Sequence, residues 1–266
     1  MSNAAFRAED RPVRIAVQVA PQHLPIAALR DAAVRVEELA ADMVLNWDHF
    51  FPLSGGRDGL HFEAWTQLAQ WAEATERIEI GPLVNCNSYR NANLQADMAR
   101  TIDHISNGRF VFGTGSGWAE RDYEEYGFEF GTVGSRLNDL ARDLPIVRDR
   151  WTKLNPPPVR RIPILIGGKG EQKTLRIVAE HADVWHSFVR PEEVPHKLDV
   201  LQGHAEAIGR DVAEIEIGNE LRGEDETTAQ AYFDAGVRLF TVGVTGPDID
   251  FENVARWIRW RDAHNG

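Results

Sequence analysis

Apolar stretches typical of buried strands alternate with amphipathic helical stretches along this chain. The strands predicted from these patterns cover 13–19, 43–45, 78–83, 110–112, 162–166, 184–185, 215–217 and 237–244. Predicted helices lie between and after them, at 27–40, 62–72, 94–102, 137–151, 175–182, 191–208, 228–235 and 254–258. Eight strand–helix units in strict order predict an α/β fold, a closed (β/α)8 TIM barrel.

The length agrees with this architecture, because the chain has 266 residues and such a barrel needs about 250. Two small domains or a wide open sheet are the alternatives, but no linker or low-complexity block divides the chain. We therefore expect one TIM-barrel domain over 13–266, preceded by a flexible leader at 1–12. Within the helix at 137–151, Pro145 is expected to cause a kink or a break.

The composition argues against several classes of partner. The net charge is −12, which is unfavourable for binding nucleic acid or an acidic membrane surface. Cys86 is the only cysteine, so an intrachain disulfide is impossible, and the histidines show no ligand spacing that indicates a metal. The sequence contains neither an 18-residue apolar run nor a secretory segment, so we expect a cytoplasmic protein with no membrane partner.

Barrel enzymes carry their active sites at the carboxyl ends of the strands. Here those ends hold glycines, aromatic residues, few carboxylates and two histidines, at 48–49, 84–85, 113–118, 167–170 and 185–186. They lack a carboxylate pair for glycoside hydrolysis, a Gly-x-Ser-x-Gly elbow and a metal-binding cluster. The set suits a large, flat, partly apolar cofactor with an anionic tail.

The glycine-rich stretch Gly167–Gly170 lies between a predicted strand and a predicted helix. Glycine lets backbone N–H groups approach an oxyanion, and a helix N-terminus favours negative charge. Lys169 and Lys173 would add positive charge. From these residues alone, a phosphate site and a tight turn with solvated lysines are equally supported.

His49 follows the second strand, where a histidine can position a substrate or transfer a proton near neutral pH. Taken alone, it is better interpreted as a histidine bonded to the backbone of the barrel rim. The acidic run Glu120, Asp122, Glu124 and Glu125 is interpreted as favourable charge in a first helical turn, without a catalytic role. Trp118 and Trp185 stand at strand ends and are therefore candidates for the pocket.

Four segments together, at 47–53, 81–109, 112–130 and 162–185, resemble the luciferase-like monooxygenase superfamily. The resemblance is strongest to its branch of oxidoreductases that use the deazaflavin coenzyme F420. It implies a flavin or deazaflavin ring over the third strand, with a non-proline cis peptide at Leu83–Val84. It also implies a phosphate site at Gly167–Gly170 and contacts to the polyol from Gly115, Trp118 and Ala119.

The candidate site residues follow from the strand ends and this resemblance. His49 is the candidate catalytic residue. The candidate cofactor-binding residues are Asp48, His49, Leu83, Val84, Asn85, Gly115, Trp118, Ala119, Gly167, Gly168, Lys169, Gly170 and Trp185, and no metal ligand is expected.

The chain departs from the family pattern in two places. Family members usually carry a β-rich insertion before the fifth strand, and here it is shortened, since Asn155 and Pro156 follow soon after Trp151. Asn85 and Cys86 stand where relatives commonly have threonine and glycine, which leaves the cofactor open between F420 and FMN.

The first hypothesis is therefore an F420-dependent oxidoreductase that transfers a hydride between the cofactor and a small organic substrate. The second is an FMN-dependent monooxygenase supplied by a separate reductase, and the third is a non-catalytic flavin-binding protein of the same fold. An unrelated phosphate-binding aldolase or isomerase is the fourth alternative. It would need a lysine or a carboxylate that projects from the barrel mouth, and Lys169 is the single strand-end lysine. Relatives are usually homodimers, so a homodimer is expected.

Overall fold

The computed structural model describes residues 11–223 and 225–266. Its strands are β1 (Arg14–Val19), β2 (Met43–Asn46), β3 (Glu79–Pro82), β4 (Asn85–Cys86), β5 (Phe112–Gly115), β6 (Ile164–Gly167), β7 (Val184–Ser187), β8 (Glu216–Leu221) and β9 (Leu239–Val244). Its α-helices are α1 (Ile26–Glu38), α2 (Ala64–Ala74), α3 (Ala92–Ile105), α4 (Glu120–Tyr126), α5 (Val133–Lys153), α6 (Thr174–His181), α7 (Val194–Ala207), α8 (Glu226–Asp234) and α9 (Phe251–Asn265).

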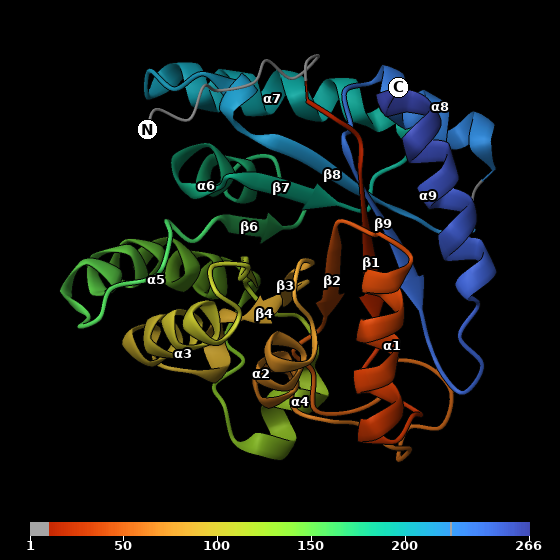
Figure 1. Ribbon diagram of the computed structural model, residues 1–266. Helices are drawn as coiled ribbons and strands as arrows, with labels where there is room; N and C mark the ends of the chain where they lie inside the picture. Colours follow the sequence, from red (N-terminus) through yellow and green to blue (C-terminus); the bar gives the residue numbers. More distant parts are fainter. Residues whose placement is uncertain (1–10, 224) are drawn as a thin grey trace.

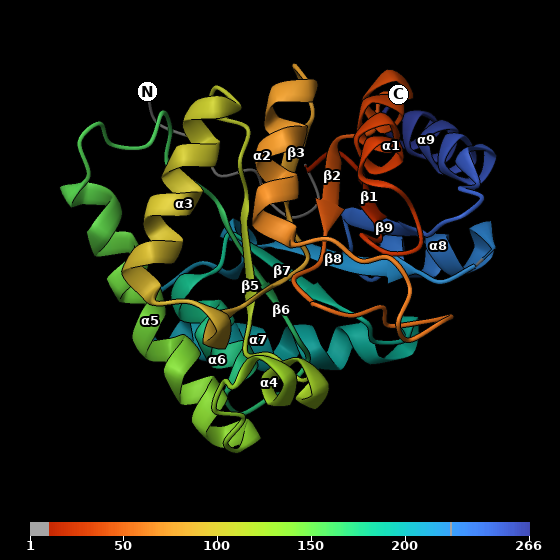
Figure 2. The ribbon, with the colours of Figure 1, turned by 90° about the horizontal axis from the view of Figure 1, so that it is seen from below.

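The strands form one parallel sheet in the order β3-β2-β1-β9-β8-β7-β6-β5-β4. Only Leu83 and Val84 separate β3 from β4, so β3 matches the predicted third strand and β4 continues it beyond its predicted end at 83. A parallel bridge between Ile80 and Phe110 brings the two edges of the sheet together. The predicted barrel is confirmed as a nearly closed one, with helices around the outside of the strands (Figures 1 and 2).

Two layers of apolar side chains explain why the strands are buried on both faces. Along β1, Ile15, Val17 and Val19 belong to the cluster between the strands and the helices. Ala16 points the other way and packs inside the barrel with Met43 and other interior residues. Alternate residues of each strand thus face the barrel interior, and those near the carboxyl end reach its mouth.

Several local predictions differ from the structure. The fourth strand begins at Phe112 rather than Phe110, because residues 110 and 111 pair only with the edge of β3. Helix α5 runs from Val133 to Lys153 without a break at Pro145. Helix α3 begins at Ala92, before the predicted start at Leu94, and Leu94 is 52% exposed because Ala96, Ala99 and Ile102 lie on the buried face.

Two further predictions concern the leader and the insertion. Residues 1–10 of the predicted leader lie outside the described residues, and Arg11 donates to the carbonyls of Ala213 and Glu214. The connection at 154–163 between α5 and β6 contains neither a helix nor a strand, as the shortened insertion predicts.

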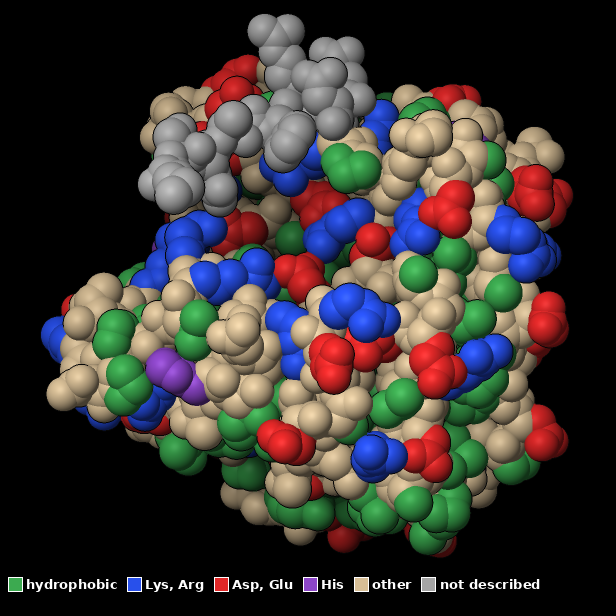
Figure 3. Space-filling view, viewed as in Figure 1, with side chains coloured by type: hydrophobic (Ala, Val, Ile, Leu, Met, Phe, Trp, Pro, Cys, Tyr) green, Lys and Arg blue, Asp and Glu red, His purple; other side chains and the backbone are tan. Residues whose placement is uncertain are grey.

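Within the part of the chain that the structure describes, every helix is too short or too polar to cross a bilayer. Acidic and basic side chains are interspersed over the face shown in Figure 3.

Candidate functional site

A cavity of about 520 Å³ opens at the carboxyl ends of the strands, within the 300–1,000 Å³ typical of ligand pockets. Nine of the predicted site residues line it, namely Asp48, His49, Leu83, Val84, Asn85, Gly115, Trp118, Gly167 and Gly168. The other lining residues are Gln18, Trp47, Leu53, Cys86, Tyr89, Ser116, Gly117, Phe188, Glu220 and Arg222. Strand ends distant in sequence therefore meet at one mouth.

Four of the candidate residues do not line this cavity. Lys169 and Gly170 are exposed and follow Gly167 and Gly168, which do line the cavity. Ala119 lies outside the cavity, directly before α4. Trp185 is fully buried, and its indole N–H donates to the carbonyl of Gly168 at 2.7 Å. Trp185 thus supports the glycine loop from behind.

The floor of the cavity is built around Val84. The Leu83–Val84 peptide bond is cis, as predicted, and the amide of Gln18 donates to the carbonyl of Leu83 at 2.6 Å. A Cβ at Gly115 would lie 2.8 Å from a Val84 methyl carbon, and one at Gly167 would lie 3.1 Å from the other. A side chain at position 115 would therefore displace Val84, and one at position 167 would be in tight contact with it.

Asp48 is buried beneath the mouth, and its carboxylate is fully engaged. Arg90 donates to both of its oxygens, at 2.6 and 3.0 Å, and the Cys86 backbone N–H donates at 3.1 Å. Arg90 also pairs with Glu63 at 2.7 Å. Burial raises the pKa of Asp48 above its ordinary value, and the Arg90 guanidinium opposes that rise. Asp48 ties the loops after β2 and β4 together.

His49 lies in the wall of the cavity. Its interpretation as a histidine bonded to the backbone of the rim was wrong, because its ring bonds to the side chain of Asp122. Its Nδ1 atom lies 2.7 Å from a carboxylate oxygen of Asp122, and its side chain is 12% exposed. The edges of Trp118 and Trp47 pack near the ring, with centroids 5.3 and 6.2 Å away.

Asp122 was missed as a site residue. It does lie in the first turn of α4, as the interpretation of the acidic run requires, but it is only 2% exposed. Helix-end charge alone does not explain a buried carboxylate paired with a histidine. One feature of the sequence could have indicated a buried Asp122. Tyr123 follows it directly within an otherwise acidic stretch, and these two residues form the buried side of α4.

Cys86, Tyr89 and Tyr123 form a buried cluster at one side of the cavity, and Cys86 and Tyr89 also line it. The thiol of Cys86 lies 3.2 Å from the hydroxyl of Tyr123, and the two tyrosine rings pack edge to face. Burial raises the pKa of Cys86 to about 11. Burial also raises the pKa values of both tyrosines. All three groups are therefore neutral at neutral pH, and Cys86 is a poor nucleophile.

Phe188, Glu220 and Arg222 line the opposite rim. The Arg222 guanidinium pairs with Glu220 and lies over the Phe188 ring, 4.8 Å from its centroid. The sequence pattern missed these residues because the predicted seventh strand ended at 217, whereas β8 continues to Leu221 and carries polar residues into the mouth.

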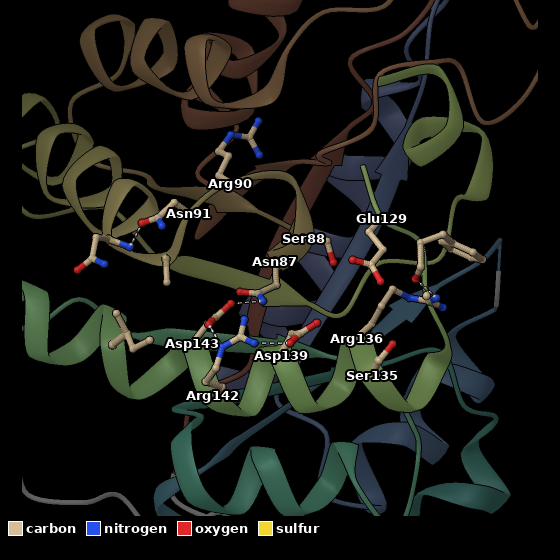
Figure 4. A pocket seen from close by; sticks show the side chains of 15 residues that line it. Asn87, Ser88, Arg90, Asn91, Glu129, Ser135, Arg136, Asp139, Arg142 and Asp143 are labelled. Carbon is tan, nitrogen blue, oxygen red and sulfur yellow. Dashed lines mark hydrogen bonds and ion pairs between the residues drawn. The ribbon is translucent and has the colours of Figure 1, made fainter. Parts of the chain in front are cut away.

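A second cavity, of about 720 Å³, lies between the start of α3 and one face of α5 (Figure 4). Its charged groups mostly satisfy one another: Arg142 pairs with Asp139 and Asp143, and the Asn87 amide donates to Asp143 at 2.8 Å. These partners leave little polar capacity for a ligand. Among the described residues, no group of three or more histidine, cysteine, aspartate or glutamate side chains could hold a metal.

A parallel barrel with an apolar cavity at the carboxyl ends of its strands defines an α/β-barrel protein with a ligand-binding mouth. The family model described as luciferase-like monooxygenase matches residues 11–256. The chain belongs to this family.

Relatives with assigned activities fall into two groups. An F420-dependent glucose-6-phosphate dehydrogenase of Amycolatopsis mediterranei is 34% identical over 131 residues, which cover 48% of this chain and 38% of that protein. The pyrimidine monooxygenase RutA of Klebsiella pneumoniae is 25% identical over 248 residues, which cover 80% of this chain and 65% of that protein. The chain thus spans less than two thirds of these relatives' length.

Solved structures share the fold. An F420-dependent secondary alcohol dehydrogenase, in complex with an F420-acetone adduct, superposes with a TM-score of 0.80 at 15% identity, covering 91% of this chain and 96% of that one. The EDTA monooxygenase of Chelativorans sp. BNC1 gives a TM-score of 0.66 at 13% identity, covering 85% of this chain and 67% of that one.

Proposed function

We propose that this protein is an F420-dependent oxidoreductase that transfers a hydride between the cofactor and a small organic substrate. The observation that carries the proposal is the cavity at the strand ends, which joins an apolar floor at Leu83 and Val84 to a histidine in its wall. The F420-dependent relative and the F420-dependent structural neighbour support the same cofactor.

The residues present fit a deazaflavin with a phosphate-bearing tail. Leu83, Val84 and Trp118 offer apolar surface for a flat ring. The stretch Gly167–Gly170 leads to the N-terminus of α6, where Lys173 provides no side-chain cap and the Leu175 N–H donates to the carbonyl of Gly170. An anion there would be held by the other N–H groups of this turn and by the helix dipole. When bound, the deazaflavin would supply the hydride chemistry.

The side chains of this protein would orient the substrate and manage protons. Trp47, Trp118 and Phe188 line the cavity, and a substrate packed against these rings would be partly shielded from water, which strengthens its polar interactions. His49 would hold or transfer the proton that accompanies hydride transfer, because its ring lines the cavity.

A titration with two cofactors tests the proposal. Purified protein freed of bound cofactor is titrated separately with F420 and FMN, and binding is followed by cofactor fluorescence and by calorimetry. We expect F420 to bind at least about tenfold more tightly, a difference of about 1.4 kcal/mol. If neither cofactor binds, the proposal is wrong.

An FMN-dependent monooxygenase supplied by a separate reductase is the second candidate. It is favoured by the pyrimidine monooxygenase relative, and it remains open because Asn85 and Cys86 stand where relatives commonly have threonine and glycine. Tighter binding of FMN, with oxygen-dependent turnover once a flavin reductase is added, would select it. Tight binding of either cofactor without turnover on carbonyl, imine or alcohol substrates would instead indicate a non-catalytic flavin-binding protein.

A further inference from the structure

We infer that Asp122 is a positioning residue that holds His49 in the Nδ1–H form, so that Nε2 is the nitrogen that exchanges a proton with the substrate. The inference deepens the proposed function, because it assigns a direction to the proton transfer at His49. It rests on the hydrogen bonds around one buried carboxylate, whose helix is remote in sequence from the histidine.

Three donors converge on the Asp122 carboxylate. Its Oδ2 atom lies 2.7 Å from His49 Nδ1 and 3.1 Å from the Tyr89 hydroxyl. Its Oδ1 atom accepts the backbone N–H of Phe50 at 3.2 Å. An ionised carboxylate can only accept hydrogen bonds, so the His49 nitrogen that faces it must carry a proton.

The proton on Nδ1 determines what the opposite nitrogen can do. In a neutral imidazole with Nδ1–H, Nε2 carries the lone pair and can accept a proton. In the imidazolium form, Nε2–H can return that proton, while Asp122 stabilises the positive charge. Trp47 and Trp118 pack near the ring and limit its rotation.

The charged and titratable groups around His49 come from separate elements. Asp122 belongs to α4, Tyr89 to the short 3-10 helix Asn87–Tyr89, and His61 to the loop before α2. Burial lowers the pKa of His61 to about 4, with a smaller contribution from His49, and burial raises that of Tyr89. Both are therefore neutral near pH 7, and Asp122 is the one anion bonded to the His49 ring among the described residues.

The position of α4 fixes this carboxylate. Gly117, with φ of 77°, starts the turn that leads into the helix, and a Cβ there would lie 2.1 Å from the Tyr123 hydroxyl and 2.5 Å from the Cys86 sulfur. Tyr123 is the neighbour of Asp122 and is itself fully buried. The loop after β5 is therefore packed against Cys86 at the end of β4, and the hydrogen bonds of Asp122 to His49 and Phe50 connect α4 to the loop after β2.

Nitrogen-15 NMR of the cofactor-free protein tests the inference directly. The signals of the His49 ring nitrogens are identified as those that are present in the wild-type spectrum and absent from the spectrum of His49→Gln. We expect neutral wild-type His49 to carry its proton on Nδ1, and Asp122→Asn to shift the ring toward the Nε2–H tautomer, because an amide can turn its NH2 toward Nδ1. Glu120→Gln, an exposed charge in the same helical turn, is the matched control and should leave the tautomer unchanged.

Kinetics give a second readout. In Asp122→Asn we expect kcat to fall about tenfold or more, as in other carboxylate–histidine pairs, with the Kd of the cofactor changed less than twofold. A wild-type His49 that carries its proton on Nε2 overturns the inference without any variant, and so does an unchanged tautomer in a folded Asp122→Asn protein. Because the NMR measurement needs no cofactor, failure to bind F420 or FMN would contradict the proposed function alone.

Discussion

His49 is the residue on which the proposed chemistry depends most. Replacing it with alanine should lower kcat by about 10²–10⁴-fold, the usual contribution of a general acid or base, while the Kd of the cofactor changes little. Steady-state kinetics and a cofactor titration measure the two effects separately. His104→Ala is the control, since that ring bonds to the carbonyl of Pro157 on the exterior. Equal turnover in His49→Ala and wild type would remove His49 from the mechanism.

The sequence identified residues at the site where their type and position at a strand end were both informative. His49, Val84 and Gly168 each follow or interrupt a predicted strand, and all three line the cavity. The role of Asp48 was not evident, because its partner Arg90 comes from another loop. Pairings between distant side chains depend on the fold, which a local pattern does not contain.

At the scale of elements, helix α4 connects the loop after β5 to the wall of the cavity. Gly117→Ala should weaken this connection, because the added methyl group meets Tyr123 and Cys86. Gly127→Ala is a matched control: this glycine also has a positive φ, 71°, but a Cβ there would meet nothing within 4 Å. We expect the control to lose about 1–2 kcal/mol of unfolding free energy from its backbone conformation alone, and Gly117→Ala to lose more.

Urea denaturation followed by circular dichroism measures both variants. Cofactor affinity or the NMR signal of His49 should change in Gly117→Ala and not in Gly127→Ala, which lies at the far end of the helix. Equal losses of stability in the two variants would show that the packing of Tyr123 against Cys86 contributes nothing.

The elements that could be predicted share one property, which is a buried face with a regular period. The strands and most helices have it, and the sequence placed them to within a few residues, except that α9 continues to Asn265, beyond its predicted end at 258. Helix α4 and the end of β8 lack it, because their important residues are polar and face the mouth of the barrel. At Pro145 the sequence predicted an interruption that the structure lacks. The packing of α5 maintains a helix there, although the local propensity of proline opposes one.

At the scale of the whole molecule, buried histidines make the fold sensitive to acid. Burial lowers the pKa values of His61 and His181 to about 4 and that of His186 to about 3, from an ordinary value of 6.5. At a pH between the lowered pKa values of the folded protein and the ordinary value of 6.5, these histidines bind protons in the unfolded chain but not in the folded one. The free energy of unfolding therefore falls as the pH decreases from 6.5. Urea midpoints measured between pH 7.5 and about 5 should show this loss.

His186→Gln isolates one contribution, because His186 is fully buried and bonded to Thr241. The unfolding free energy of the His186→Gln protein should depend less steeply on pH than that of wild type. This expectation holds whatever the stability of the variant at pH 7. His196→Gln, in which the replaced ring is 64% exposed, should keep the wild-type slope. A His186→Gln slope identical to wild type would contradict this account.

The packing of Val84 against Gly115 and Gly167 bears on how this barrel can diversify. The Val84 side chain packs between Gly115 and Gly167 at the floor, so the depth of the pocket depends in part on this position. A shorter side chain there would deepen the chamber without altering the rim, and a bulkier one would force the strands apart. Substitution at the floor of the pocket can therefore change the size of ligand that this scaffold accepts, without a change in the loops that surround the entrance.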